Sequence, residues 1–167
     1  MQTQKTDSTG RPLIDDVCVK ILKPLPDERG RLMELLRSDE PIYERFAQAY
    51  VTVCNPRIVK GWHYHKKQVD HFVGLGGEAK VVLYDGRKGS KTIGSINEFI
   101  LSWANPIMVK IPTYVLHGFT ATGKEEAMII NFPTELYHYT DPDEYRTDPF
   151  SPDVPYDWGD VDRRLSR

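Results

Sequence analysis

Two histidines separated by one residue, His63 and His65, lie in the segment 61–77 of this 167-residue chain. Because side chains alternate between the two faces of a strand, both imidazoles point to the same side if this segment is extended. A carboxylate, Asp70, follows them, and a third histidine, His117, lies in a later apolar run. Imidazoles transfer protons near neutral pH, and together with a carboxylate they bind divalent metal ions. These residue types predict a pocket for proton transfer or for a metal.

A single histidine is more often a structural residue than a functional one. Three of the five histidines of this chain fall at the positions named above, which favours a functional pocket over coincidence. The other two, His71 and His138, have no comparable partners in the sequence and are read as structural.

The elements that must position these histidines are predicted to be strands. Short runs rich in Val, Ile, Thr and aromatic residues alternate with turn signals such as Asp85-Gly86. The runs occupy residues 17–22, 31–36, 47–53, 58–65, 71–75, 79–84, 93–101, 106–111, 117–121 and 127–132. Many short strands at regular spacing predict an all-β sandwich or barrel.

The chain is expected to form one domain over residues 1–167, because this length suffices for a single stable core. Residues 1–12 are expected to be a flexible segment. One short helix is predicted at 41–46, after a polar stretch that could cap it. From Tyr137 onward the chain is rich in Asp, Pro and Tyr, which predicts an irregular or partly helical arm around the barrel. The last residues, 163–167, are expected to be loose.

Composition excludes several classes of function. The chain has 22 basic and 24 acidic residues and no basic cluster interleaved with aromatics, so we expect no nucleic-acid partner. It has no apolar run long enough to span a membrane and a polar first ten residues, so we expect no membrane partner and a cytoplasmic location. Cys18 and Cys54 are isolated and lack metal or redox spacing, which is typical of buried thiols in a reducing compartment.

Several motifs together resemble those of dTDP-4-dehydrorhamnose 3,5-epimerases, which are cupins. They occur in the same order and at similar spacing: DERGRLME at 27–34, Gln48, GWHY at 61–64, GE at 77–78, DGR at 85–87, IPTYVLHGF at 111–119 and DVPYDW at 153–158. The string GWHYHKK at 61–67 is also similar to that of sugar-nucleotide 3,4-ketoisomerases. The resemblance implies an antiparallel cupin-type β-barrel or jelly roll with short helices and a C-terminal arm.

The resemblance also implies a substrate and a mechanism. The substrate would be a nucleoside diphosphate carrying a 4-keto-hexose, whose ketone acidifies the neighbouring C–H bonds, and no metal or other cofactor would be needed. His63 would be the base that removes the proton, and His117 would lie near the substrate or orient that base. The resemblance further assigns substrate binding to Arg29, Glu34, Gln48, Lys60 and, in the arm, Tyr137. Cupins of this kind commonly dimerise by exchanging an N-terminal strand, so residues 17–22 predict a homodimer.

Two departures from the epimerase pattern leave the reaction open. Asp70 and Ile130 stand where the family has a lysine and a proton-donating tyrosine. His65 could return the proton that His63 removes, which would suit a single-site epimerase or a 3,4-ketoisomerase.

Two alternatives belong to other classes of protein. One is a metal-dependent cupin, a dioxygenase, isomerase or lyase, with His63, His65, Asp70 and His117 as ligands. The other is a cupin that binds sugar without catalysis.

Overall fold

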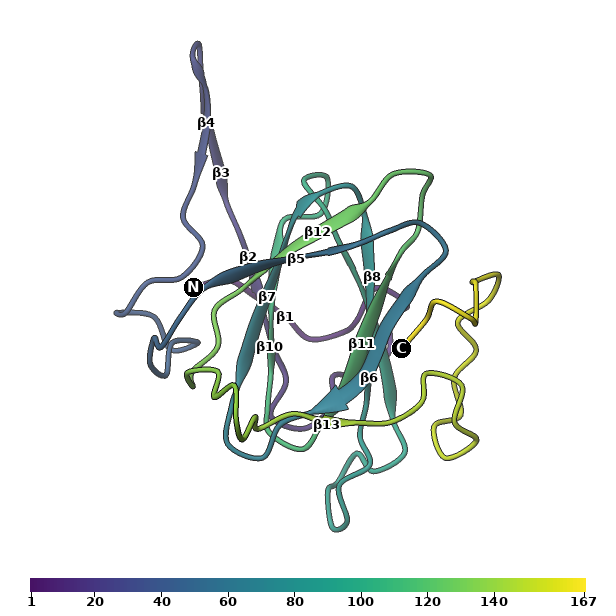
Figure 1. Ribbon diagram of the computed structural model, residues 1–167. Coiled ribbons are helices and arrows are strands. Elements are labelled where there is room, and N and C mark those ends of the chain that lie inside the picture. Colours follow the sequence, from purple (N-terminus) through teal and green to yellow (C-terminus); the bar gives the residue numbers. More distant parts are fainter.

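The computed structural model describes residues 1–167, and its regular elements are all strands (Figure 1). One sheet has six strands in the order β1 (Thr3–Gln4), β2 (Cys18–Ile21), β10 (Ile107–Ile111), β7 (Asp70–Gly76), β12 (Ala127–Asn131) and β5 (Tyr50–Cys54). The other has five in the order β13 (Tyr145–Arg146), β6 (Val59–Tyr64), β11 (Leu116–Ala121), β8 (Ala79–Tyr84) and β9 (Ile96–Leu101). All the pairings within these two sheets are antiparallel. The predicted all-β antiparallel barrel is confirmed.

The core lies between the two sheets, where alternate residues of each strand point inward. In β9 every second residue is buried, including Phe99 and Leu101. Val109 and Ile111 of β10 face them from the other sheet, in one cluster of 18 buried apolar residues. Burial of this kind contributes about 1.5–3 kcal/mol per large side chain. This cluster therefore fixes the barrel on which the histidines are carried.

The helix predicted at 41–46 is wrong. These residues contain one turn, in which the Tyr43 N–H donates to the Glu40 carbonyl at 3.0 Å, and then run on without regular structure. Six residues are too few to repay the entropy of helix nucleation. The segment is held instead by tertiary contacts, since Ile42 is buried beside Leu22 and the Arg45 side chain donates to the Thr134 carbonyl at 2.5 Å. The structure contains no helix that is long and apolar enough to cross a membrane.

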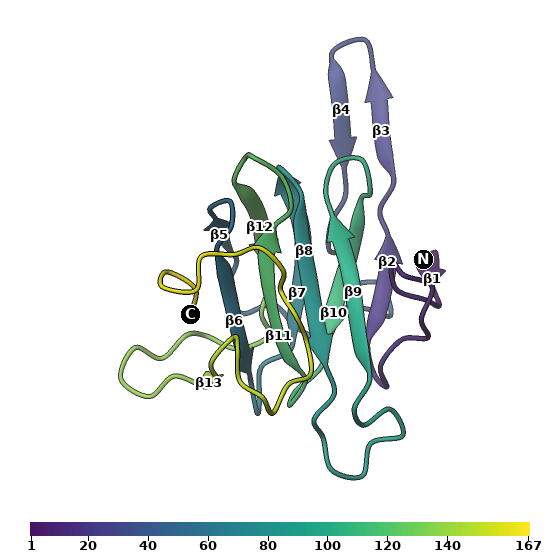
Figure 2. The same cartoon turned by 90° about the vertical axis from the view of Figure 1, so that its right-hand side faces the viewer.

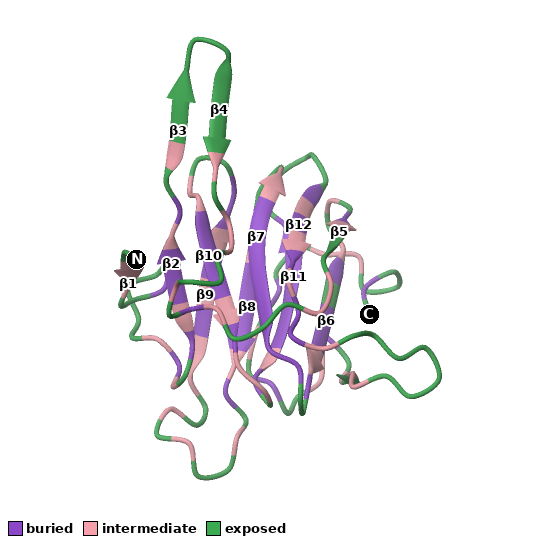
Figure 3. Ribbon diagram, turned by 90° about the vertical axis from the view of Figure 1, so that its left-hand side faces the viewer, coloured by how far each residue is buried: buried purple, intermediate pink, exposed green.

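The strands β3 (Pro24–Asp27) and β4 (Gly30–Met33) form a hairpin that projects away from the barrel (Figures 1 and 2). Its tip residue Arg29 donates to Asp27 at 2.6 Å. Leu25 and Leu32 are 46% and 60% exposed, and Figure 3 shows the hairpin as the largest exposed element outside the loops. A two-stranded hairpin is only marginally stable by itself.

Both ends of the chain lie against the barrel. Thr3–Gln4 pairs with β2, and the Asp7 carboxylate accepts the backbone N–H groups of Thr9 and Arg11. The C-terminal arm crosses the outside of the five-stranded sheet, where Trp158 packs on Trp62 at 4.8 Å between ring centroids (Figure 2). The arm is irregular, with no helical part.

The last residue also differs from expectation. The Arg167 N–H donates to the Val59 carbonyl, and the Arg167 carbonyl accepts the Gly61 N–H. These bonds lay residues 166–167 along β6 rather than leaving them loose.

Candidate functional site

The histidine cluster is built first by the pairing of two strands. His63 of β6 lies opposite His117 of β11 in the ladder, and their ring centroids are 4.0 Å apart. His65 joins them, with its ring centroid 5.3 Å from that of His63. Close approach of the two strands depends on a glycine pair, because a Cβ at Gly61 would lie 2.7 Å from Gly118 Cα. The three histidines predicted to share a pocket are therefore in contact.

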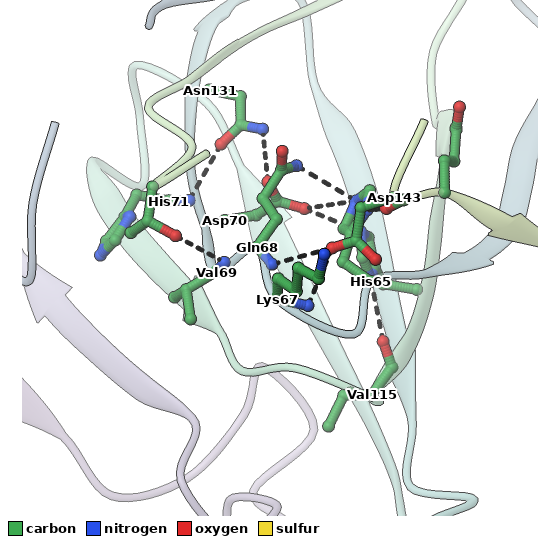
Figure 4. Close-up of polar contacts among 12 residues, drawn as sticks. His65, Lys67, Gln68, Val69, Asp70, His71, Val115, Asn131 and Asp143 are labelled. Carbon is green, nitrogen blue, oxygen red and sulfur yellow. Dashed lines mark hydrogen bonds and ion pairs between the residues drawn. The ribbon is translucent and has the colours of Figure 1, made fainter. Parts of the chain in front are cut away.

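Asp70, the first residue of β7, brings a carboxylate to this cluster from the opposite sheet (Figure 4). It is 1% exposed, and its Oδ1 accepts Gln68 Nε2 and Asn131 Nδ2, each at 2.8 Å. Its Oδ2 lies 3.2 Å from the Nε2 atoms of both His65 and His117. Asp70 Oδ2 and His117 Nε2 nevertheless have no hydrogen bond of acceptable geometry. The centre of the cluster is thus a buried polar site that the protein alone does not satisfy.

The remaining ring nitrogens explain why the centre is unsatisfied. His117 Nδ1 donates to the Val115 carbonyl at 3.0 Å, so a neutral ring presents the lone pair of Nε2 to Asp70. His65 Nδ1 faces the Asp143 carbonyl, so its Nε2 also turns a lone pair toward Asp70, although this nitrogen has a partner in Gln68 Nε2 at 3.3 Å. A lone pair beside a carboxylate is unfavourable unless a proton or a cation lies between them. The cluster is therefore arranged to hold a positive charge.

Burial and neighbouring charges shift the pKa values of Asp70, His65 and His63 in different ways. Burial would raise the pKa of Asp70, but its contacts with His117 and His65 outweigh burial and hold that pKa well below the usual range. Burial would lower the pKa of His65, but the carboxylate of Asp70 outweighs it and raises that pKa. For His63, burial together with the neighbouring His117 and His65 lowers the pKa well below its ordinary value. His63 is thus held in its neutral form at pH 7.

A cavity of about 350 Å³ opens beside His63, between the edge strand β5 of one sheet and β6 of the other. His63 is the one member of the cluster that lines it. The apolar part of the wall comes from Ile58, Val59, Phe72, Phe119 and Leu165, and the polar part from Tyr50, Thr52, Lys60, Glu144, Arg146 and Arg167. Three cations and one carboxylate around an apolar wall suit an anionic organic ligand.

Only part of the predicted binding set reaches this cavity. Lys60 lines it and donates to Thr52 Oγ1 at 3.0 Å. Arg29 and Glu34 belong to the projecting hairpin and the segment just after it. Gln48 and Tyr137 do not line the cavity either, and Tyr137 is 45% exposed beside Tyr139.

Five polar lining residues were not predicted from the sequence, namely Tyr50, Thr52, Glu144, Arg146 and Arg167. Arg146 and Glu144 form an ion pair at 2.8 Å next to the short strand β13, which pairs with β6. No pattern in the arm marks that pairing, because β13 has only two residues. The alternation of polar and apolar residues in 47–53 was the one available signal for Tyr50.

Comparison with known proteins gives relatives of one kind. The polysaccharide biosynthesis C-terminal domain family matches residues 25–145. The chain is 42% identical over 148 residues to the probable low-salt glycan biosynthesis epimerase Agl13 of Haloferax volcanii, covering 87% of this chain and 90% of that protein. It is 41% identical over 134 residues to the spore coat polysaccharide biosynthesis protein SpsL of Bacillus subtilis, covering 80% and 89%.

Solved structures agree with these matches. A dTDP sugar isomerase from Desulfovibrio desulfuricans superposes with a TM-score of 0.82 at 30% identity, covering 89% of this chain and 94% of that one. A dTDP-6-deoxy-D-glucose-3,5-epimerase from Legionella pneumophila, solved with dTDP-4-keto-L-rhamnose, gives a TM-score of 0.80 at 26% identity, covering 96% and 87%. The family resemblance read from the motifs is confirmed.

Proposed function

Because this chain belongs to the dTDP-4-dehydrorhamnose 3,5-epimerase-like cupins and to the polysaccharide biosynthesis C-terminal domain family, we propose that it epimerises a sugar nucleotide. The sugar carries a ketone at C4, and His63 abstracts the proton from a carbon next to that ketone. The observation that carries this proposal is the position of His63, the one imidazole of the cluster that faces the cavity.

The steps follow from the charges around His63. The ketone makes the neighbouring C–H bond acidic, so a neutral imidazole can remove the proton and leave an enolate. His63 is available in the neutral form, since burial and the two neighbouring imidazoles lower its pKa. Asp70 stands behind His117 and stabilises the positive charge that His63 acquires. His65 and His117 then serve to hold and orient that carboxylate.

The cavity charges support a diphosphate. Lys60, Arg146 and Arg167 surround the opening, and Glu144 offsets one of these charges. An arginine binds phosphate oxygens in a bidentate manner, which a lysine cannot do. The nucleotide and the sugar are thus proposed to lie on either side of this cationic rim. The reaction is proposed to belong to deoxysugar or polysaccharide biosynthesis in the cytoplasm.

A homodimer remains part of the proposal. Strand β2, which lies in the segment 17–22 predicted to be exchanged between subunits, pairs with β1 and β10 of its own chain. The projecting β3–β4 hairpin, with Leu25 and Leu32 exposed, has little of its own chain to pack on. We propose that it packs on a second copy, which would carry Arg29 and Glu34 toward the partner's cavity. This accounts for motif residues that lie far from the histidines of their own chain.

Incubation of the protein with UDP- and dTDP-linked 4-keto-6-deoxyhexoses in heavy water, followed by ¹H NMR, tests the reaction. An epimerase replaces the proton at C3 or C5 by deuterium and forms a new stereoisomer. A 3-keto product would identify a 3,4-ketoisomerase. Binding with no exchange at any carbon would overturn the proposal in favour of a non-catalytic sugar-binding cupin.

A metal-dependent cupin is the second candidate, favoured by the unsatisfied centre of the cluster. Ligand atoms of His63, His65, Asp70 and His117 lie within 4.8 Å of one another, and a cation would satisfy both Asp70 Oδ2 and His117 Nε2. Three imidazoles and a carboxylate fit divalent iron, manganese, nickel or zinc. Such an ion would supply Lewis acidity toward the ketone.

Metal analysis of protein purified without chelator and without a metal-affinity tag tests this candidate. About one equivalent of a divalent metal, lost in His117→Ala and kept in the matched variant His138→Ala, would support it. Less than a tenth of an equivalent in the unmodified protein, also after incubation with each metal and desalting, would exclude it.

A further inference from the structure

Tyr50 lines the same cavity as His63 but comes from the opposite sheet. It begins β5, the edge strand of the six-stranded sheet, and pairs with Asn131 of β12. His63 lies on β6, in the five-stranded sheet. A ligand in the cavity therefore lies between an imidazole and a phenol that approach it from different walls.

The hydroxyl of Tyr50 is oriented by a buried amide. Asn131 is fully buried, and its Oδ1 accepts the His71 backbone N–H at 2.9 Å. That bond turns Asn131 Nδ2 toward two acceptors, Tyr50 Oη at 2.9 Å and Asp70 Oδ1 at 2.8 Å. Because Tyr50 Oη accepts this hydrogen bond and makes no other, its own proton is left for a group in the cavity.

The two other positions at which a second proton carrier is expected, 130 and 65, do not offer a proton to the cavity. Ile130 packs in the apolar cluster of Leu22 and Val73, so the strand position before Asn131 faces away from the cavity. His65 does not line the cavity, and its two ring nitrogens face the Asp143 carbonyl and Asp70. Of these side chains, only that of Tyr50 combines a free proton with access to the cavity.

We propose that Tyr50 is the second proton carrier of the epimerisation. His63 takes the proton from the carbon next to the ketone, and the electron pair of that C–H bond forms an enolate. Tyr50 Oη–H then gives its proton to the same carbon from the other face, which inverts it and leaves a tyrosinate. The tyrosinate regains a proton from the His63 imidazolium through solvent, so the enzyme is restored. This inference rests on the proposed function.

The acidity of the phenol suits this role. Although Tyr50 as a whole is 41% exposed, desolvation of its hydroxyl, and after it the charge of Asp70, raises the pKa of Tyr50 to about 12. The hydroxyl is therefore protonated at neutral pH, as a donor must be. The hydrogen bond from Asn131 stabilises the tyrosinate once the proton has left.

The variant Tyr50→Phe separates the two half-reactions. It keeps the ring in the cavity wall and removes only the hydroxyl. The matched control is Tyr64→Phe, because Tyr64 is carried by β6 but stacks on Tyr145 and Tyr114, at 5.1 and 6.2 Å between ring centroids, outside the cavity. Deuterium incorporation and stereoisomer formation are followed in the same samples of 4-keto sugar nucleotide, and thermal unfolding checks the fold of each variant.

We expect Tyr50→Phe to form the new stereoisomer about 100-fold more slowly while still exchanging the proton at the reacting carbon with solvent. Tyr64→Phe is expected to match the unmodified protein in both readings. Stereoisomer formation by Tyr50→Phe at the unmodified rate would overturn the assignment of Tyr50 and leave the proposed function standing. Absence of exchange and product in the unmodified protein would overturn both.

Discussion

Two buried aspartates, Asp70 and Asp85, occupy the same barrel but have different surroundings. Asp85 is fully buried after β8, and five hydrogen bonds reach its carboxylate, three from Arg87 and one each from Ser90 and Thr92. Asp70 is almost as buried, but its Oδ2 lies between two imidazoles without a hydrogen bond. Hydrogen bonds from its own loop thus satisfy the Asp85 carboxylate, whereas Oδ2 of Asp70 has no hydrogen-bonding partner in the protein.

The difference separates structure from function. Arg87 also donates to the Asp15 carbonyl at 2.8 Å, so the Asp85 cluster fastens an N-terminal loop to the barrel. A buried polar atom with no partner costs stability, about 1–3 kcal/mol. A buried polar atom without a partner is therefore found mainly where the group binds a ligand or takes part in catalysis. The motif DGR at 85–87, which helped to identify the family, therefore holds a loop in place, while Asp70 belongs to the histidine cluster.

Of the substitutions at these two aspartates, Asp70→Asn should have the larger effect on activity. The substitution keeps the shape but removes the negative charge behind His63, so we expect turnover to fall about 100-fold. The free energy of unfolding should stay within about 1 kcal/mol of the unmodified value, because the new amide can donate to an imidazole lone pair. Turnover by NMR and urea unfolding measure the two quantities, and unchanged turnover would remove Asp70 from the site.

Asp85→Ala should show the opposite pattern. It leaves the Arg87 guanidinium, which is 17% exposed, with only the exposed Asp16 as an acidic partner, and we expect about 3 kcal/mol lower stability in urea. Turnover per folded molecule should not change. The matched control Asp39→Ala breaks an exposed pair with Arg37 and should leave the unfolding curve unaltered. Equal effects of Asp85→Ala and Asp39→Ala would contradict the comparison.

A smaller effect is expected in the pH dependence of stability. Burial would raise the pKa of Asp85, but the hydrogen bonds from Arg87, Ser90 and Thr92 outweigh it and hold the pKa below the value of an unfolded chain. The stabilisation is therefore complete above about pH 4 and is lost as pH falls, by about 1.4 kcal/mol per unit. The stability difference between the unmodified protein and Asp85→Asn should be constant from pH 5 to 8 and smaller at pH 3. A constant difference down to pH 3 would show that the carboxylate is not the titrating group.

The barrel could be predicted because its strands carry local signals. The run predicted at 79–84 has the bounds of β8, since turn residues flank a continuous apolar stretch. β3 is not among the predicted runs, because Pro24 and Pro26 are unusual in strands. The predicted helix failed for the converse reason, since a capping residue and a few polar residues do not decide a six-residue segment.

The histidine cluster could be predicted because period-two spacing places His63 and His65 on one face. Tyr50 and Arg146 could not be found in this way. Each reaches the cavity through a long-range pairing, Tyr50 with Asn131 and Arg146 with His63. Local sequence patterns do not specify such pairings.

Deuterium incorporation from heavy water by the unmodified protein and by His63→Asn tests the central claim, that His63 is the base of an epimerase, most directly. The account predicts incorporation at the carbon next to the ketone of a 4-keto sugar nucleotide, and a loss of at least about 1,000-fold in the variant, with unfolding unchanged. Incorporation by His63→Asn at the unmodified rate would contradict it.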